Sequence, residues 1–398
     1  MDRFDAIARA LRSASLDGWL FYDFRLSDPL AYRILGIPEH GLTTRRWFCL
    51  IPSEGTPVAL VSAVEANRLD ALPFPDRIVY RSEREMINAL ANLLKGRRRI
   101  AMNYSPNCAI PYVSRVDGGT VELVRSLGVE VVTAADLIQL FEATLTPDQL
   151  DGHRRAAAAL RTIVLEAFAE IARRIRSDQR CSEAIVQHFV LDQIASHGMR
   201  TDEPPIVAVN ANAANPHFGN SEEHDTPIRI GGLVLIDLFA KETGDDAIYG
   251  DLTWIGYIGE TVPKAYAQVF AIVAQARDAA VALIQRRVTE GQSVTGAEAD
   301  RAARSIIEAA GYGDQFVHRT GHSIGREVHG TGANLDSLET SDSRSLIENT
   351  CFSVEPGIYL PGRFGIRSEL DMTIAQGRAE VSAAPAQSAI IPLLARTI

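Results

Sequence analysis

Short apolar runs separated by polar turns predict a mixed α/β domain in the first 145 residues. Residues 3–13 have the spacing of an amphipathic helix, and the turn sequence Pro52-Ser53-Glu54-Gly55 between two apolar runs predicts a hairpin. The runs that predict strands cover residues 18–22, 46–51, 57–61, 99–104, 121–124 and 129–132. Helical or loop segments fill the intervals, so the region has the pattern and size of one domain.

Longer amphipathic segments follow from residue 146 onward. Thr146-Pro147-Asp148 supplies an N-cap, a first-turn proline and an early acid, which together start a helix. Thr295 and Glu298 form a capping box at the start of another helix. The predicted helices cover residues 146–176, 182–197, 263–288 and 296–310, and the predicted strand regions cover 206–209, 231–259 and 351–375. We therefore predict two domains, residues 1–145 and 146–398.

Composition narrows the class of protein. A chain of 398 residues is too long for one ordinary core, and 46% hydrophobic with 23% charged residues is typical of soluble globular proteins. The net charge of −10 argues against a nucleic-acid-binding surface. We expect no membrane span, because no apolar run reaches about 18 residues, and no signal peptide, because the N-terminus lacks a basic region followed by an apolar run.

The cysteines point to a reducing compartment. They lie far apart and never form a C-x-x-C motif, at Cys49, Cys108, Cys181 and Cys351. We expect reduced, structural cysteines rather than disulfides or zinc ligands, which fits a cytoplasmic protein.

Two aspartates interrupt apolar strands in the second domain. Asp237 ends the apolar run 232–236, and Asp251 precedes Leu252-Thr253-Trp254, with Thr253 on the same face as Asp251. Thr253 can hydrogen-bond that carboxylate and fix its orientation. The polar turn 241–246 predicts a hairpin that brings the two aspartates side by side; the alternative is that each merely caps a turn.

A glycine-punctuated segment carries two histidines. His322 and His329 lie within Gly321-His322-Ser323-Ile324-Gly325-Arg326-Glu327-Val328-His329. The glycines allow a tight backbone path close to a site. A lone histidine is usually an ordinary core or surface residue, whereas two in this frame can serve as a ligand and a proton carrier.

Two glutamates end neighbouring strands further along. Glu355 precedes a Pro-Gly turn, and Glu369 follows on the next strand. Arg367 lies on the face of Glu369 and can pair with a carboxylate or bind an anionic substrate end. The alternative for either glutamate is a solvated position at the sheet edge, and the alternative for Arg367 is an ordinary surface arginine.

Together these residues predict a metal centre. Burying four carboxylates without counter-charge is costly, and two divalent cations balance them. Carboxylate oxygens with one imidazole suit Mn²⁺, Fe²⁺, Co²⁺ or Zn²⁺. Two such ions can deprotonate a bridging water and polarise a carbonyl, so the site is predicted to be hydrolytic.

The order Asp, Asp, His, Glu, Glu resembles the pita-bread metallopeptidase family, which includes methionine aminopeptidase, aminopeptidase P, prolidase and the metal-free creatinase. The His322 and Glu355-Pro-Gly segments are the most specific matches, followed by Gly365-Ile366-Arg367-Ser368-Glu369. The resemblance covers residues 150–380 well and 1–145 loosely. It implies a creatinase-like N-terminal α/β domain, for oligomerisation or substrate access, and a C-terminal pita-bread domain with a curved antiparallel sheet flanked by helices.

The resemblance also implies roles and partners. The metal ligands fall on Asp237, Asp251, His322, Glu355 and Glu369. Glu355 is expected to shuttle protons, His217 and His329 to orient substrate and stabilise the intermediate, and Arg367 to hold the site's carboxylates. The expected activity is hydrolysis of the Xaa-Pro bond of dipeptides or peptide N-termini by a metal-bridging hydroxide. Two divalent ions, Mn²⁺ foremost, and a cytoplasmic homodimer acting on small peptides are implied in the same way.

Some positions depart from the family's pattern. Phe239 replaces a common glycine, Gly330 replaces the usual acid after the second histidine, and the acid after the last glutamate is displaced to Asp371. The Asp237–Asp251 interval is longer than usual, so Asp245 or Asp246 competes as the second ligand, although only Asp251 precedes the Leu-Thr-Trp pattern. The remaining alternatives are a metal-free pita-bread protein, creatinase-like or peptide-binding, and a metal-dependent hydrolase of a non-proline substrate.

Overall fold

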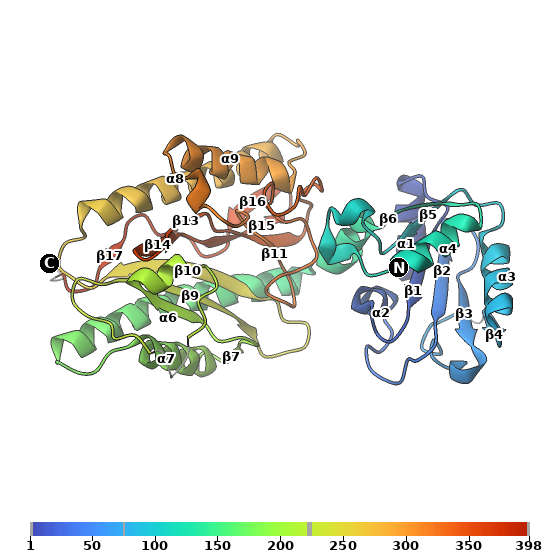
Figure 1. The fold of residues 1–398 in the computed structure, drawn as a ribbon, viewed down its shortest axis with the longest axis horizontal. Helices are drawn as coiled ribbons and strands as arrows, with labels where there is room; N and C mark the ends of the chain where they lie inside the picture. Colours follow the sequence, from blue (N-terminus) through green and yellow to red (C-terminus); the bar gives the residue numbers. More distant parts are fainter. Residues whose placement is uncertain (1–2, 75, 221–224, 396–398) are drawn as a thin grey trace. The chain divides into compact units, whose positions relative to one another are not determined.

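The chain divides into two compact units in the computed structural model, which describes residues 3–74, 76–220 and 225–395 (Figure 1). The units are Met1–Glu142 and Ala143–Ile398. The boundary between them is close to the predicted one between residues 145 and 146. Each unit has its own sheets and its own hydrophobic core.

The first unit is built on a six-stranded mixed sheet with the strand order β4-β3-β2-β1-β5-β6. Its strands are β1 (Gly18–Asp23), β2 (Trp47–Pro52), β3 (Val58–Ser62), β4 (Arg77–Tyr80), β5 (Arg99–Met102) and β6 (Glu130–Thr133). Its helices are α1 (Arg3–Ser13), α2 (Pro29–Leu35), α3 (Glu83–Leu94), α4 (Gly118–Ser126) and α5 (Ala135–Ile138). Side chains of α1 and α2 pack with Trp19 and Phe21 on one face, and those of α3 and α4 pack with Leu20 and Tyr22 on the other. The predicted hairpin is confirmed as the antiparallel pair β2–β3.

One predicted strand in this unit is wrong. Residues 121–124 lie in α4, where Asp117 caps the helix by accepting hydrogen bonds from Thr120 N at 2.8 Å and Thr120 Oγ1 at 2.7 Å. Val121 and Val124 are both buried, because residues three positions apart lie on the same face of a helix. A four-residue valine-rich run has no length to distinguish this spacing from a strand.

The second unit has two helical layers around several short sheets. Its helices are α6 (Pro147–Arg176), α7 (Glu183–Ser196), α8 (Lys264–Thr289) and α9 (Gly296–Ala309). Its strands are β7 (Met199–Arg200), β8 (Ile206–Val209), β9 (Leu233–Glu242), β10 (Gly250–Tyr257), β11 (Ser323–Ile324), β12 (Thr350–Val354), β13 (Gly357–Leu360), β14 (Phe364–Arg367), β15 (Leu370–Ala375), β16 (Arg378–Val381) and β17 (Ile391–Pro392). The helices and strand regions predicted after residue 146 are confirmed, as are both capping boxes.

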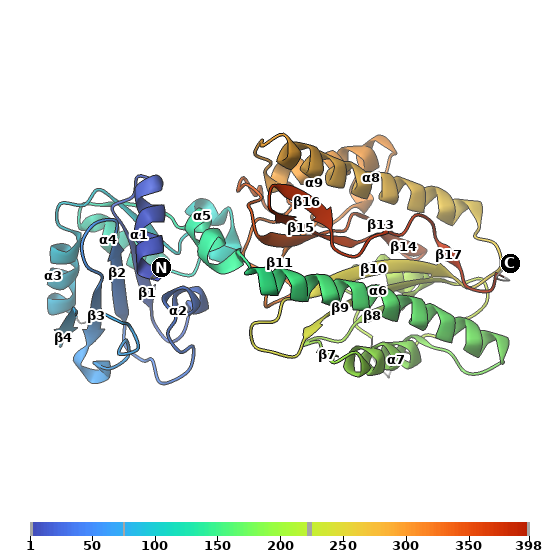
Figure 2. The same ribbon diagram turned by 180° about the vertical axis from the view of Figure 1, so that it is seen from behind.

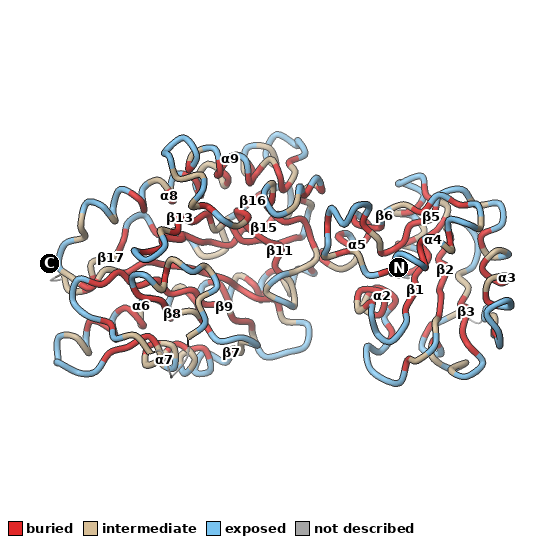
Figure 3. The backbone as a smooth tube through the Cα atoms, viewed as in Figure 1, coloured by how far each residue is buried: buried red, intermediate tan, exposed pale blue. Residues whose placement is uncertain are grey.

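Side chains along β9 and β10 alternate between two faces, and each face packs against a different pair of helices. Even-numbered residues such as Ile236 and Trp254 pack under α6 and α7, and α6 lies along both strands (Figure 2). Odd-numbered apolar residues such as Leu235 and Ile255 join the core formed with α8 and α9. Odd positions therefore face the interior of the unit, where the backbone is mostly buried (Figure 3).

Helix α8 is a core helix. Among the described residues it is the one helix long and apolar enough, by length and composition, to pass for a membrane span. Its buried side chains include Phe270, Val273, Ala280 and Ile284, which belong to the same core cluster as the strands of this unit. Its buried face therefore belongs to the core of this unit.

A buried histidine connects α6 to the strands. His153 is fully buried; its Nδ1 lies 2.6 Å from the Tyr249 carbonyl oxygen, so Nδ1 carries the proton, and its Nε2 lies 2.8 Å from Ser382 Oγ. Burial lowers the pKa of His153 to about 4 and outweighs the Asp371 carboxylate 3.9 Å away. The imidazole is therefore neutral at neutral pH.

This burial predicts a pH-dependent stability. The pKa of His153 rises from about 4 in the folded state to about 6.5 on unfolding, so its contribution is complete above pH 6.5 and is lost as the pH falls toward 4. Between pH 7.5 and pH 5 the free energy of unfolding should fall by about 2 kcal/mol more in the wild type than in His153→Gln. Urea unfolding of both proteins at the two pH values measures this; an equal fall in both contradicts it.

Candidate metal centre

The paired strands β9 and β10 bring the two aspartates to one interior face. Thr253 lies opposite Asp237 in the antiparallel register, and Asp251 lies opposite Phe239. Asp237 and Asp251 are therefore diagonal neighbours, and Thr253 shares their face; all three are buried. The competing residues Asp245 and Asp246 lie in the exposed turn between the strands, where Asp246 pairs with Arg326 at 2.9 Å.

The glycine-framed segment delivers His322 beside Glu355. A Cβ on Gly321 would lie 2.0 Å from the Ser353 carbonyl oxygen, so only glycine permits this approach. The backbone N–H of His322 donates to Ser353 Oγ at 2.9 Å, and Ser353 Oγ donates to Glu355 Oε1 at 3.1 Å. The backbone N–H of Glu355 donates to Thr320 O at 2.7 Å. Local backbone contacts thus fix both side chains.

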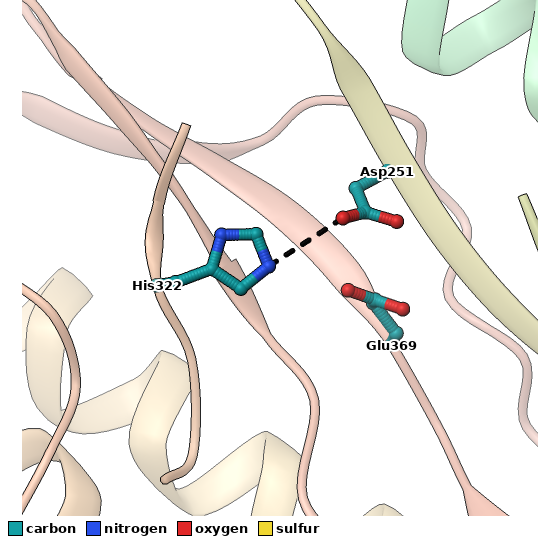
Figure 4. A group of neighbouring side chains, drawn as sticks. All are labelled: Asp251, His322 and Glu369. Carbon is teal, nitrogen blue, oxygen red and sulfur yellow. Dashed lines mark ion pairs between the residues drawn. The ribbon is translucent and has the colours of Figure 1, made fainter. Parts of the chain in front are cut away.

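Three of the predicted ligands converge directly. Asp251, His322 and Glu369 each offer a ligand atom, and these atoms all lie within 4.8 Å of one another (Figure 4). His322 Nε2 is 3.5 Å from Asp251 Oδ2 and 3.4 Å from Glu355 Oε1. Because Nδ1–H faces the Ser323 carbonyl oxygen at 3.2 Å, the unprotonated Nε2 points toward the carboxylates.

Arg367 and Thr253 join the other carboxylates to this trio. Arg367 forms an ion pair with Asp237, and its Nε lies 3.8 Å from Glu355 Oε2 and donates to Thr253 Oγ1 at 3.0 Å. Thr253 Oγ1 donates to Glu369 Oε2 at 2.5 Å. The predicted partner of Thr253 was Asp251, so that expectation is corrected: the threonine orients the glutamate because the two lie across adjoining strands.

The electrostatics of the cluster fit divalent cations. Burial, followed by repulsion from Asp237 and Glu355, raises the pKa of Asp251 well above its ordinary value, and burial with repulsion from Asp251 does the same for Glu369. Burial opposes the charge of Arg367, but the Asp237 carboxylate outweighs it and raises the pKa of Arg367. Asp251 Oδ1 is buried and accepts no hydrogen bond from the described residues. A buried group of carboxylate oxygens with one imidazole nitrogen suits hard or borderline divalent metal ions.

The predicted histidines outside the ligand set border the cluster. The rings of His329 and His322 meet edge to face with centroids 4.4 Å apart. His217 lies in an exposed turn, and its charge contributes to lowering the pKa of His329 and of His318. Arg367 NH1 donates to the carbonyl oxygen of Pro216, the neighbour of His217, at 3.3 Å. His217 is thus near the site.

His318 and Tyr359 border the site and were not predicted from the sequence. Tyr359 OH donates to His318 Nε2 at 2.7 Å and accepts from Arg367 NH1 at 3.3 Å, so both belong to the wall of the site. Burial, with the charge of Arg367, lowers the pKa of His318 to about 3. The signal available in the sequence was the position of His318 four residues before His322.

Two departures from the family pattern have structural explanations. A Cβ on Gly330 would lie 2.9 Å from Ser323 Oγ and 3.2 Å from the Ile324 carbonyl carbon, so an acid does not fit there without local movement. Asp371 is buried, and its Oδ2 accepts the backbone N–H of Asp251 at 2.8 Å. The displaced acid therefore faces the inside of the unit, where it contacts a predicted ligand's backbone.

Comparison with known proteins identifies a family that matches more than half of this chain. Residues 151–376 match Metallopeptidase family M24. A putative Xaa-Pro aminopeptidase of Mycoplasma pneumoniae is 30% identical over 240 residues, 57% of this chain and 62% of that protein, so the match spans less than two thirds of that relative. A probable dipeptidase PepE of Mycobacterium tuberculosis is 29% identical over 272 residues, 68% of this chain and 67% of that protein.

The fold comparison extends over nearly the whole chain. The crystal structure of dipeptidase PepE from Mycobacterium ulcerans superposes with a TM-score of 0.70 at 24% identity, covering 98% of this chain and 97% of that one. The expected fold, an N-terminal α/β domain followed by a pita-bread domain, is confirmed. The family resemblance inferred from the five residues is confirmed as well, and this chain belongs to metallopeptidase family M24.

Proposed function

We propose that this protein is a dinuclear-metal-dependent peptidase that hydrolyses the Xaa-Pro bond of dipeptides or of peptide N-termini. The observation that carries the proposal is the convergence of Asp251, His322 and Glu369 within 4.8 Å, with Glu355 beside His322. Asp237 completes the proposed ligand set through its contact with Arg367. The names of the similar proteins, Xaa-Pro aminopeptidase and dipeptidase, support the substrate class.

Two divalent ions held by Asp237, Asp251, His322, Glu355 and Glu369 supply an activated water and a polarised substrate carbonyl when bound. Glu355 is the group placed to carry a proton from that water to the leaving nitrogen. It is less buried than Asp251 or Glu369, and its two oxygens face His322 on one side and Arg367 on the other. A carboxylate in this position can take a proton and release it on the substrate side.

His329 and His217 are proposed to orient the substrate and stabilise the tetrahedral intermediate. Both residues keep surface accessible to solvent, although the His329 ring packs against His322. The charge of His322, followed by burial, lowers the pKa of His329 to about 3, so its imidazole is neutral and keeps one N–H to donate. Such a donor aimed at developing negative charge stabilises the transition state. Arg367 is proposed to hold the carboxylates in place.

The remaining assignments follow the family resemblance. We propose Mn²⁺ as the preferred ion, with Co²⁺, Zn²⁺ or Fe²⁺ as substitutes, because all suit carboxylate and imidazole ligands. We also propose a cytoplasmic homodimer in which the 1–145 region contributes to assembly or to substrate access. The metal-free alternative has the weaker support, because all five ligand positions are retained.

The substrate proposal predicts metal-dependent cleavage of Xaa-Pro peptides. Purified protein with Mn²⁺ should hydrolyse Ala-Pro or Ala-Pro-Ala, and EDTA should abolish the activity because the water is then not activated. Cleavage of the dipeptide alone indicates a dipeptidase, and preference for the tripeptide an aminopeptidase. If Mn²⁺ binds but neither peptide is cleaved, while a non-proline dipeptide is, the proline requirement is wrong.

Removing the proton carrier should stop turnover without unfolding the protein. Glu355→Gln keeps the side-chain volume and should lower kcat at least about 100-fold, the usual contribution of a positioned acid–base group. The matched control is Glu380→Gln, at an exposed position on β16. Circular dichroism and metal content show whether the fold and the ions survive. Near-wild-type kcat in Glu355→Gln would rule out the assigned role.

A further inference from the structure

The edge of β10 that faces β15 is closed by isolated hydrogen bonds, most of them from side chains, rather than by a strand ladder. Strand β10 pairs with β9 along its length and with β17 at Gly256 and Tyr257, whereas β15 pairs with β12 and β16. In an antiparallel pair, alternate residues turn their N–H and C=O groups to the far edge. On β10 these are residues 251, 253 and 255.

Each of these residues finds a partner outside a ladder. Asp251 N–H donates to Asp371 Oδ2 at 2.8 Å, and Glu369 N–H donates to Thr253 O at 3.2 Å. Ile255 receives two bonds from one side chain: its N–H donates to Gln387 Oε1 at 2.9 Å, and Gln387 Nε2 donates to its carbonyl oxygen at 2.7 Å. The Gln387 amide thus replaces one residue of a missing strand.

We call this contact between β10 and β15 the seam. Two of the proposed metal ligands lie on opposite sides of it. Asp251 is on β10, and Glu369 immediately precedes β15, yet their ligand atoms lie within 4.8 Å (Figure 4). A one-residue slip of a strand turns its side chains to the opposite face. Because no ladder sets the register of β10 against β15, isolated bonds must set it. They are one backbone bond, from Glu369 N–H to Thr253 O, and the side-chain bonds of Asp371, Thr253 and Gln387.

Gln387 is itself firmly held. Its side chain is buried, whereas Ser388 and Ala389 beside it are exposed. Arg277 NH1 of α8 donates to the Gln387 carbonyl oxygen at 2.9 Å and to Ser368 Oγ at 2.6 Å, next to Glu369. Helix α8 therefore ties both sides of the seam to one buried guanidinium.

We propose that Gln387 is a positioning residue for the metal centre: it holds β10 in register against β15 and thereby sets the separation of Asp251 and Glu369. It lies outside the ligand set and acts through Ile255. The inference deepens the proposed function and rests on it for the metal ions, but not for the choice of peptide substrate.

The test is Mn²⁺ titration of metal-free full-length protein by calorimetry, with melting temperatures recorded in parallel. Gln387→Met fills the space but cannot bond Ile255, and its Kd for Mn²⁺ should rise by about 10- to 100-fold, as for other residues that orient ligands. The matched control is Gln285→Met, which removes an amide that donates to Ala379 O at 3.3 Å, away from the seam. Its Kd should stay within about 2-fold of the wild type.

A second variant guards against loss of folding. In Gln387→Glu, burial favours the neutral carboxyl group, which can accept from Ile255 N–H and donate to Ile255 O. Its Kd should lie closer to the wild type than that of Gln387→Met. A lower melting temperature with unchanged Kd in Gln387→Met would show a merely structural role and overturn the inference.

The metal titration also separates this inference from the proposed substrate. If the wild type binds two Mn²⁺ but cleaves no Xaa-Pro peptide, the substrate proposal fails. The effect of Gln387→Met on the Kd for Mn²⁺ then still decides whether Gln387 positions the metal centre. If the wild type binds no Mn²⁺, both are overturned.

Discussion

The main physical constraint on the second unit is a cluster of carboxylates buried close to one another. Asp237, Asp251, Glu369 and Asp371 are each at most 6% exposed, and Glu355 lies beside them. Arg367 contacts the cluster from one side, but a single guanidinium cannot balance five carboxylates. Two divalent cations would balance this charge, and we propose that they make the same cluster a hydrolytic centre. The electrostatic constraint and the proposed chemistry are therefore one feature.

The fold satisfies this constraint by assembling the centre from elements that are distant in sequence. The β9–β10 pair supplies the aspartates, the glycine-framed segment before β11 supplies His322, and the strand ends around β12 to β15 supply the glutamates. Helices cover the outer faces of these strands, so the ligands have little freedom to move. Side-chain bonds at the seam between β10 and β15 complete the frame, because no ladder joins the two strands there.

Much of the candidate site could be predicted from sequence because its ligands carry local signals. Asp251 was separable from Asp245 and Asp246 by the apolar pattern that follows it, and the exposed turn explains why the other two face away. His322 and Glu355 sit in glycine or Pro-Gly frames that ordinary helices and strands avoid. The long helices could be predicted for the same reason, because amphipathic segments with capping residues are local signals.

What could not be predicted depends on tertiary contacts. Residues 121–124 predict a strand but lie in a helix, because a short valine-rich run has no distinguishing period. The partner of Thr253 is Glu369, which is 116 positions away, and Gln387 meets Ile255 across 132 positions. His318 resembles any loop histidine until Tyr359 is placed against it. Such pairings carry no periodic signal in one sequence.

The central claim is that these five side chains hold two divalent ions. Crystals grown with Mn²⁺ and measured at the manganese absorption edge test it most directly. The account predicts two anomalous peaks enclosed by Asp237, Asp251, His322, Glu355 and Glu369. A map with no peak among these side chains, or with only one at full Mn²⁺ saturation, contradicts the dinuclear centre.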